Sequence, residues 1–181
     1  MNIVLIGIPG SGKSTQGKLL SEKLEIPYIA MGGILRDIAD ESTKRGKRIK
    51  TTLEHGDLLP DDEVIAIARE YLSKPENSHG YIIDGFPRTV NQAQNFSHDI
   101  DTVLLVMLDD KEALWRIALR IDPRNDQSAA TIMHRLKVFH RDTDPLIEFY
   151  KQAGVLHEID GYPSIEEVHT AILKELGHDT V

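Results

Sequence analysis

The segment 7–14, with the sequence GIPGSGKS, is the first part of the chain whose residue types and spacing suggest chemistry. Glycines allow successive backbone N–H groups to point into one concavity around a polyphosphate, and a helix start adds its positive dipole end. Lys13 can then reach the β- and γ-phosphates, and the Ser14 hydroxyl can hold Mg²⁺. A plain glycine-rich turn is the alternative, but it does not need the Gly-Lys-Ser ending. The residues expected to bind a nucleoside triphosphate are Gly10, Ser11, Gly12, Lys13, Ser14 and Thr15.

A second segment, 81–94 with the sequence YIIDGFPRTVNQAQ, indicates where a metal ion would lie. Asp84 ends an apolar run that is typical of a buried strand, and open α/β folds bind ligands at this end of their strands. A carboxylate there can hold the hydration shell of Mg²⁺. We therefore expect Mg²⁺ to be held by Ser14 and Asp84, through water. The alternative is that Asp84 caps the start of a helix.

Arg88 and Gln92 follow in the same segment, four residues apart, which predicts one shared face of a helix that starts near Arg88. The forked cation of Arg88 suits a phosphate group, and the amide of Gln92 suits the edge of a base. A second nucleotide lying along that helix would use both. A glutamine that faces solvent is the alternative for Gln92.

Five of the ten arginines lie within 116–141, in a chain that is acidic overall. Such a cluster indicates an anionic partner. Phosphoryl transfer needs one, because negative charge spreads over the equatorial oxygens in the transition state. The alternative is surface ion pairing with neighbours such as Asp122 and Asp126. Ion pairing is the preferred interpretation for Arg116 and Arg141.

Short apolar segments alternate with amphipathic ones along the chain, and this alternation predicts the elements that position these residues. Strands are expected at 2–7, 26–30, 80–85, 102–109 and 155–160, and helices from about Lys13 to Lys23 and from about Ser164 to Leu176. Strands separated by helices favour right-handed βαβ units and a parallel sheet. The fold class expected is α/β, of the phosphate-loop NTPase type. Residues 31–73 interrupt the alternation, which indicates a helical insertion.

Length and charge restrict the remaining possibilities. The 181 residues suggest one domain, and the formal net charge of −8 argues against nucleic acid or an anionic membrane as the main partner. The sequence has no cysteine, so we expect no disulfide and no structural zinc. No apolar run approaches the ~20 residues of a membrane span, and the N-terminus lacks the basic flank of a signal peptide. We expect a monomer in the cytoplasm.

The motifs resemble those of the adenylate kinases, in the nucleoside monophosphate kinase family. The segment GIPGSGKSTQ (7–16) is similar to the family's phosphate loop, DGFPRTVNQAQ (84–94) to its most specific signature, and RDTDPLIEFY (141–150) to the segment after its lid. The resemblance covers nearly the whole chain. It implies a parallel-sheet core with an AMP-binding insertion and a lid, and the reaction MgATP + AMP ⇌ MgADP + ADP.

The resemblance also implies roles for individual residues. Arg36 and Arg88 would grip the phosphate of AMP, and Gln92 would read its adenine. The AMP contacts implied are Met31, Arg36, Asp57, Leu58, Leu59, Gly85, Phe86, Pro87, Arg88, Gln92, Arg124 and Arg135. On the ATP side, Arg120 and Pro163 join the phosphate loop. The catalytic residues implied are Lys13, Arg88, Arg120, Arg124 and Arg135.

The domains implied are a core of residues 1–29 and 60–181, an AMP-binding insertion of residues 30–59, and a short lid loop of residues 121–131. The lid is nearly missing, because only the residues IDP separate Arg120 from Arg124. Met31 would offer the AMP base only apolar contact, which leaves the choice of base open.

Two other functions compete with AMP phosphorylation. One is a nucleotide-binding regulatory protein of kinase fold with weak activity, and the other is a kinase that acts on CMP or UMP. The retained arginines on the acceptor side favour the enzyme, because a protein that only binds ATP has no use for them.

Overall fold

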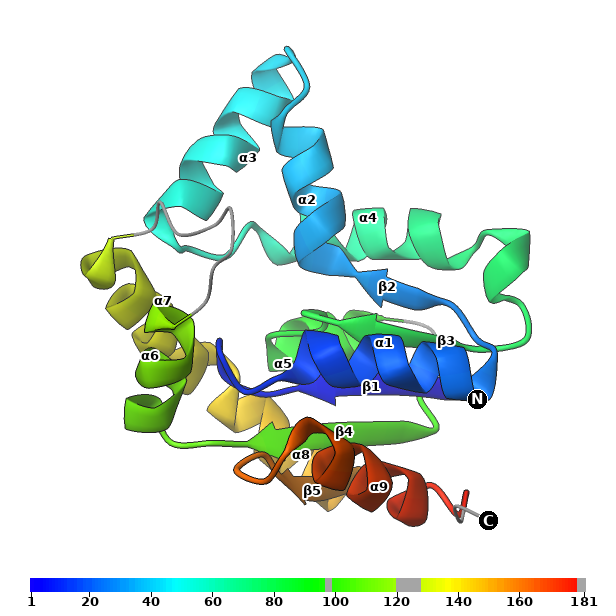
Figure 1. Cartoon of the computed structure of the whole chain (residues 1–181). Helices are drawn as coiled ribbons and strands as arrows, with labels where there is room; N and C mark the ends of the chain where they lie inside the picture. The colour runs from blue at the N-terminus through cyan, green and yellow to red at the C-terminus, as the bar shows by residue number, and fades with distance from the viewer. Residues whose placement is uncertain (97–98, 120–127, 179–181) are drawn as a thin grey trace.

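The computed structural model describes residues 1–96, 99–119 and 128–178. At its centre lies a sheet of five parallel strands in the order β2-β3-β1-β4-β5 (Figure 1). The strands are β1 (Asn2–Ile6), β2 (Tyr28–Ala30), β3 (Tyr81–Asp84), β4 (Thr102–Met107) and β5 (Leu156–Asp160). Each lies within a segment that the sequence predicts as a strand. The parallel sheet with flanking helices confirms the α/β fold class.

Helices connect the strands and cover both faces of the sheet. They are α1 (Lys13–Leu24), α2 (Met31–Ala39), α3 (Lys44–His55), α4 (Asp61–Leu72), α5 (Val90–Asn95), α6 (Asp110–Ala118), α7 (Ala129–Asp142), α8 (Asp144–Gln152) and α9 (Ile165–Glu175), with a 3₁₀ turn at Pro75–Asn77. The first and last helices match their predicted positions within a residue or two.

The sheet is apolar on both faces. Ile3 and Leu5 of β1 pack with α1 and α9 on one face (Figure 1). Val4 and Ile6 point to the other face, where α4 and α8 contribute to the larger hydrophobic cluster. Burial on both sides explains why β1 is a continuous apolar run rather than an alternating one. It also holds the loops after the strands on a rigid support.

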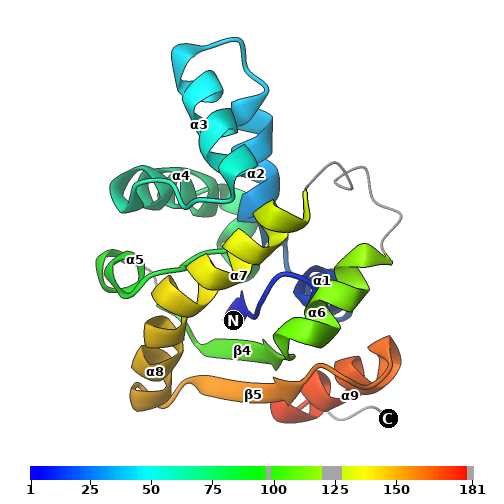
Figure 2. The ribbon, with the colours of Figure 1, turned by 90° about the vertical axis from the view of Figure 1, so that its left-hand side faces the viewer.

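A helical arm, residues 31–55, projects from the sheet (Figures 1 and 2). It consists of α2 and α3, and α4 then leads back towards β3. Glu63 of α4 accepts hydrogen bonds from Arg45 Nε at 3.0 Å and from Arg48 Nη2 at 2.8 Å, which tie α3 to α4. Burial opposes ionisation of Glu63, but its bonds to the two arginines hold its pKa below the usual value. Residues 31–73, all of them described, contain no strand, as the interrupted alternation predicts.

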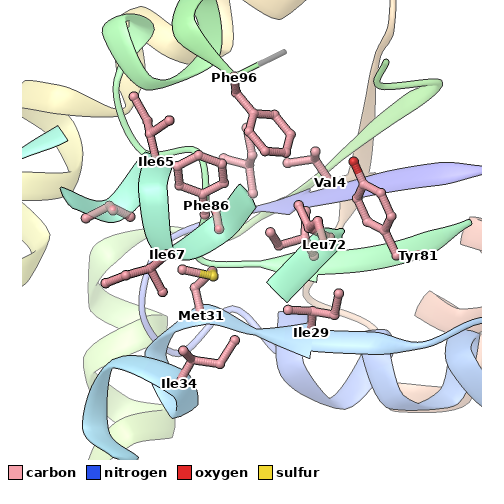
Figure 3. Close-up of a cluster of buried hydrophobic side chains, with 14 of the residues drawn as sticks. Val4, Ile29, Met31, Ile34, Ile65, Ile67, Leu72, Tyr81, Phe86 and Phe96 are labelled. Atoms are coloured by element: carbon pink, nitrogen blue, oxygen red, sulfur yellow. The ribbon is translucent and has the colours of Figure 1, made fainter. Parts of the chain in front are cut away.

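The side chains of Met31 and Phe86 lie in the hydrophobic core that joins the arm to the sheet (Figure 3). Both are 0 % exposed, and the ring of Phe86 meets that of Phe96 edge to face, with 4.9 Å between ring centroids. Met31 packs among apolar neighbours because a long apolar side chain at the start of α2 gains more from burial than from solvent. The expected contact of Met31 with the base of AMP stays a prediction.

Candidate active site

The phosphate loop joins the end of β1 to the start of α1. Gly12, which precedes the helix, has a φ of 94°, a left-handed conformation that glycine adopts without steric cost. The helix begins at Lys13 without a side-chain cap, which is the arrangement of an anion site at a helix N-terminus. The Lys13 ammonium lies across the loop, where it donates to the carbonyl of Ile8 at 3.1 Å. These features are those of a phosphate cradle.

A pocket of about 310 Å³ opens beside this loop. It is lined by Gly10, Ser11, Gly12, Thr15, Gln16, Arg116, Gly161, Pro163, Ser164, Ile165 and Val168. The structure thus brings Pro163, from the loop between β5 and α9, to the same pocket as the phosphate loop. A concave site of this size suits part of a small ligand.

Arg116 forms one wall of the pocket, although the sequence favoured a purely surface role. Its Nε donates to Glu112 Oε1 at 2.8 Å, so the expected ion pair exists. Its Nη1 and Nη2 also donate to the carbonyls of Gly161 and Tyr162, at 2.8 Å and 3.2 Å. A planar cation is thereby fixed between α6 and the loop after β5.

Ser14 and Asp84 meet at the carboxyl ends of β1 and β3. The Ser14 hydroxyl donates to Asp84 Oδ2 at 2.7 Å, and the Tyr28 hydroxyl donates to the same oxygen at 2.9 Å. Hydroxyl and carboxylate oxygens are the ligands that Mg²⁺ prefers, so these residues fit a magnesium ion beside the phosphates. The alternative role of Asp84 as a helix cap is wrong, because Thr89 caps the next helix.

Arg36 and Arg88 each lie beside a glycine, and the two glycines are neighbours. A Cβ placed on Gly85 would lie 3.3 Å from Arg88 Nη2 and 3.9 Å from the backbone nitrogen of Gly32. A Cβ on Gly32 would lie 3.4 Å from Arg36 Nη1. Arg88 Nε donates to the Gly85 carbonyl at 2.9 Å. Two guanidinium groups therefore flank one small region of backbone, which is an arrangement suited to an anionic group.

The Arg88 side chain is exposed to solvent, and its pKa is nevertheless shifted. The surrounding protein lowers its pKa, and the negative charge of Asp84 opposes that shift. An arginine keeps its charge in proteins even so. The cation of Arg88 therefore lies close enough to Asp84 to feel its negative charge.

The structure corrects the prediction that Arg88 and Gln92 share a helix face. Helix α5 begins at Val90, and Thr89 is its cap, with a side chain that accepts from the backbone of Gln92. Arg88 thus precedes the helix. Gln92 is 1 % exposed, so it is not a solvent-facing glutamine either. Its Oε1 accepts from the backbone N–H of Arg88 at 2.7 Å, which keeps the two residues together by another route.

Helix α7 contacts the end of the arm. Arg135 Nη2 donates to the carbonyl of Leu53 at 3.0 Å, and His134 Nε2 lies 2.7 Å from Asp57 Oδ1. Of the neighbouring residues expected to contact AMP, Leu58 is half-buried and Leu59 is 4 % exposed, within the core. Arg135 is thus placed against the segment at which the arm ends.

Comparison with known proteins identifies the family of this chain. The family model described as adenylate kinase matches residues 5–155. The chain belongs to the adenylate kinase family. It is 38% identical over 177 residues to an adenylate kinase of Thermobifida fusca, covering 93% of this chain and 94% of that one. It is 38% identical to one of Leptospira biflexa, covering 96% and 98%, and 34% identical to one of Clostridium botulinum, covering 99% and 100%.

Some residues that the family resemblance implied fall outside the described part of the chain. Arg120, Arg124 and residues 121–127 of the expected lid loop belong to this group. The remainder of that loop is not a loop, because Ser128 caps α7 and residues 129–131 form its first turn. Serine is a preferred helix cap, so this start could have been predicted from the sequence.

Asp61 and Tyr28, which the sequence motifs do not indicate, also contact predicted site residues of this member of the adenylate kinase family. Tyr28 bonds to Asp84, and Asp61 accepts from the side chain of Gln92 at 2.8 Å. Neither belongs to a motif of fixed spacing. In the described residues, no group of three or more His, Asp or Glu side chains could hold a metal ion, and no helix is long and apolar enough to span a membrane.

Proposed function

We propose that the chain transfers the γ-phosphoryl group of MgATP reversibly to AMP, giving two ADP. The observation that carries this proposal is the presence of two cationic sites near Asp84. The phosphate loop with Lys13 follows β1, and the Arg36–Arg88 pair lies beside Gly85 and Gly32. An enzyme that only hydrolysed ATP would not need the second cationic site, at Arg36 and Arg88.

The donor nucleotide is held by the phosphate loop and the adjoining pocket. Lys13 leaves the Ile8 carbonyl and contacts the terminal phosphates. Arg116 and Pro163 form opposite parts of the pocket wall and enclose the adenine of ATP. In phosphoryl transfer the protein contributes mainly position and charge, because the transferring group is loosely bound in the transition state.

The magnesium ion that accompanies ATP is held by Ser14 and Asp84, partly through water. When bound, Mg²⁺ neutralises the developing charge on the phosphate oxygens. Tyr28 orients the carboxylate of Asp84 through its hydroxyl. The contact of Ser14 with Asp84 supports this assignment, because it places two oxygen ligands at the end of the phosphate loop.

The acceptor nucleotide is held by its phosphate between Arg36 and Arg88, with its adenine towards Gln92 and the backbone of residues 57–59. Met31 and Phe86 support this site from the core, together with Gly85 and Pro87. Arg120 covers the base or the phosphates of ATP, and Arg124 and Arg135 clamp the transferring group. For Arg135 this requires exchange of its bond to the Leu53 carbonyl for a phosphate oxygen.

We extend the proposal to a core of residues 1–29 and 60–181, an AMP-binding unit of residues 30–59, and a monomer that acts in the cytoplasm without structural zinc. The helical arm between β2 and α4 supports the AMP-binding unit. The acidic charge and the lack of cysteine support a cytoplasmic protein that binds no nucleic acid.

A coupled assay of ADP formation tests the proposal, with ATP, Mg²⁺ and one of AMP, dAMP, CMP or UMP. We expect AMP to be the best acceptor and ADP formation to require it. Faster reaction with CMP or UMP would make the chain a pyrimidine nucleotide kinase. ADP formation that no acceptor stimulates would overturn phosphoryl transfer to a nucleotide.

A further inference from the structure

Asp61, the first residue of α4, lies beside the segment that carries Gln92. Its Oδ1 accepts from Gln92 Nε2 at 2.8 Å, and its Oδ2 accepts from Asn91 Nδ2 at 2.7 Å. The Thr89 hydroxyl donates towards both oxygens, at 3.2 Å and 3.1 Å. One half-buried carboxylate therefore collects three donors from the start of α5.

These contacts fix which way the amide of Gln92 points. Its Nε2 donates to Asp61, and its Oε1 accepts from the backbone N–H of Arg88 at 2.7 Å. A flipped amide would place Oε1 against the carboxylate of Asp61 and the NH₂ group against the N–H of Arg88. Both contacts would be repulsive, and Gln92 is only 1 % exposed, so water could not relieve them. Orientation is thus set by the protein and not by the ligand.

A primary amide has two N–H groups and two oxygen lone pairs, and the two bonds use one of each. The second N–H can donate to a ring nitrogen, and the second lone pair can accept from an amino group. A 6-aminopurine presents this pair, with its amino group as donor and N1 as acceptor. A 6-oxopurine presents the opposite pair, because its O6 accepts and its N1–H donates.

We propose that Asp61 is a positioning residue that sets the base specificity of the acceptor site, by holding the amide of Gln92 in the orientation that accepts a 6-aminopurine and rejects a 6-oxopurine. This inference rests on the proposed function, since it places the acceptor's base at Gln92. Asp61 itself contacts no substrate. Asp61 acts by fixing which side of the Gln92 amide carries the oxygen and which carries the NH₂ group.

A purely structural role for Asp61 makes a different prediction. If the carboxylate only fastens α4 to α5, its loss weakens the binding of every acceptor by a similar factor. If it orients Gln92, its loss changes the ratio between acceptors that differ only in hydrogen-bond polarity. AMP and IMP are such a pair, because they differ only at position 6 and in the protonation of N1.

The experiment measures the Kd of AMP and of IMP by titration calorimetry for the wild type and for Asp61→Asn. Asparagine keeps the size of the side chain, but it can present either oxygen or NH₂ to Gln92, so only the backbone N–H of Arg88 still opposes the flipped amide. We expect the preference for AMP over IMP to fall by about tenfold or more. Asp62→Asn removes the same charge from an exposed neighbour in the same turn and should leave the ratio unchanged.

A double variant shows whether Asp61 acts through Gln92. In Gln92→Leu the amide is gone, so the further change Asp61→Asn should not alter the ratio again. A thermal melt establishes that each variant is folded. If Asp61→Asn is not, Asp61→Ala, which removes the carboxylate, replaces it with the same expected direction.

An unchanged ratio in folded Asp61→Asn, or equal weakening of AMP and IMP, would overturn the inference, as would a wild type that binds both equally or binds neither. Because the readout is binding, it is independent of turnover. A wild type that prefers AMP but forms no ADP would defeat the proposed function while leaving the inference intact.

Discussion

The Ser14 hydroxyl donates a 2.7 Å hydrogen bond to Asp84, across the boundary between β1 and β3. Leu5, near the end of β1, is in register with Asp84 at the end of β3, so the sheet places Asp84 beside the start of the phosphate loop that leads to Ser14. The phosphate loop and the segment that leads to Arg88 therefore start from adjacent points. Two phosphate sites that begin on neighbouring strands can bring a donor and an acceptor together without a large change in the core.

Asp84→Asn should reduce kcat by about a hundredfold or more and raise the Mg²⁺ concentration needed for half-maximal rate, because the carboxylate charge at the metal site is lost. The fold should remain, since an asparagine oxygen can still accept from Ser14 and Tyr28. ADP formation measured over a series of Mg²⁺ concentrations checks this. The exposed Asp99→Asn serves as the control, and an Asp84→Asn enzyme with the same Mg²⁺ dependence as that control would remove Asp84 from the metal site.

Lys13→Ala and Arg88→Ala should each lower kcat by about two to four orders of magnitude with little change in melting temperature, because positioned charge is the main device for phosphoryl transfer. We also expect the KM of ATP to rise in the first variant and that of AMP in the second. Steady-state kinetics with both substrates varied separates these effects. Lys18→Ala, an exposed position on α1, is the control. Near-normal turnover in both variants would contradict the assignment of the two sites.

Gly56→Ala should reduce kcat, whereas its loss of stability should match that of a control glycine elsewhere. Gly56 has a φ of +83°, and an added Cβ would lie 2.9 Å from Arg135 Cγ, so the side chain of Arg135 must move. Gly154 is the matched control, because its φ is +74° and an added Cβ meets nothing within 4 Å. Both alanines cost about 1 kcal/mol of backbone strain, but only Gly56→Ala should slow turnover. Equal kcat values for the two variants would show that the position of Arg135 does not matter.

His140 should stabilise the fold at low pH and lose this effect as the pH rises. Its ring nitrogens lie 2.9 Å from Asp110 and 3.0 Å from Asp144. Hydrogen bonds to Asp110 first, and to Asp144, raise the pKa of His140 above its usual value. The protonated ring is therefore favoured in the folded state. Its contribution is complete below the unfolded pKa of about 6.5 and disappears as the pH rises through the folded pKa.

Urea denaturation of the wild type and of His140→Ala at pH 6 and pH 9 measures this contribution. The difference in unfolding free energy should be larger at pH 6, but below about 1 kcal/mol, because the side chain is well exposed and the ion pairs are screened by solvent. His79→Ala is the control, since that ring meets the Ser78 hydroxyl rather than a carboxylate. A difference that grows towards pH 9 would contradict the assigned direction.

The sequence predicted the sheet and the phosphate loop because both depend on local patterns. An apolar run of four residues, 3–6, marks β1, and the Gly-Lys-Ser ending marks the start of α1. The family follows from the same motifs and is confirmed by the family model. These features need no knowledge of contacts between distant segments.

Other parts of the site could not be predicted, because they depend on contacts across the chain. Nothing in the spacing around Arg116 shows that its guanidinium would meet carbonyls of Gly161 and Tyr162. The hydrogen bond from Gln92 to Asp61 joins residues that are 31 positions apart in the sequence. The helix start after Arg88 could have been predicted, since Thr89 is a preferred cap.

Transfer of isotopically labelled phosphate tests the central claim most directly. The protein is incubated with Mg²⁺, AMP and ATP that carries label only in its γ-phosphate, and the products are separated. We predict that the label appears in the β-phosphate of newly formed ADP, with two ADP formed for each AMP consumed. Label recovered only as inorganic phosphate, at a rate that AMP does not change, would contradict the account.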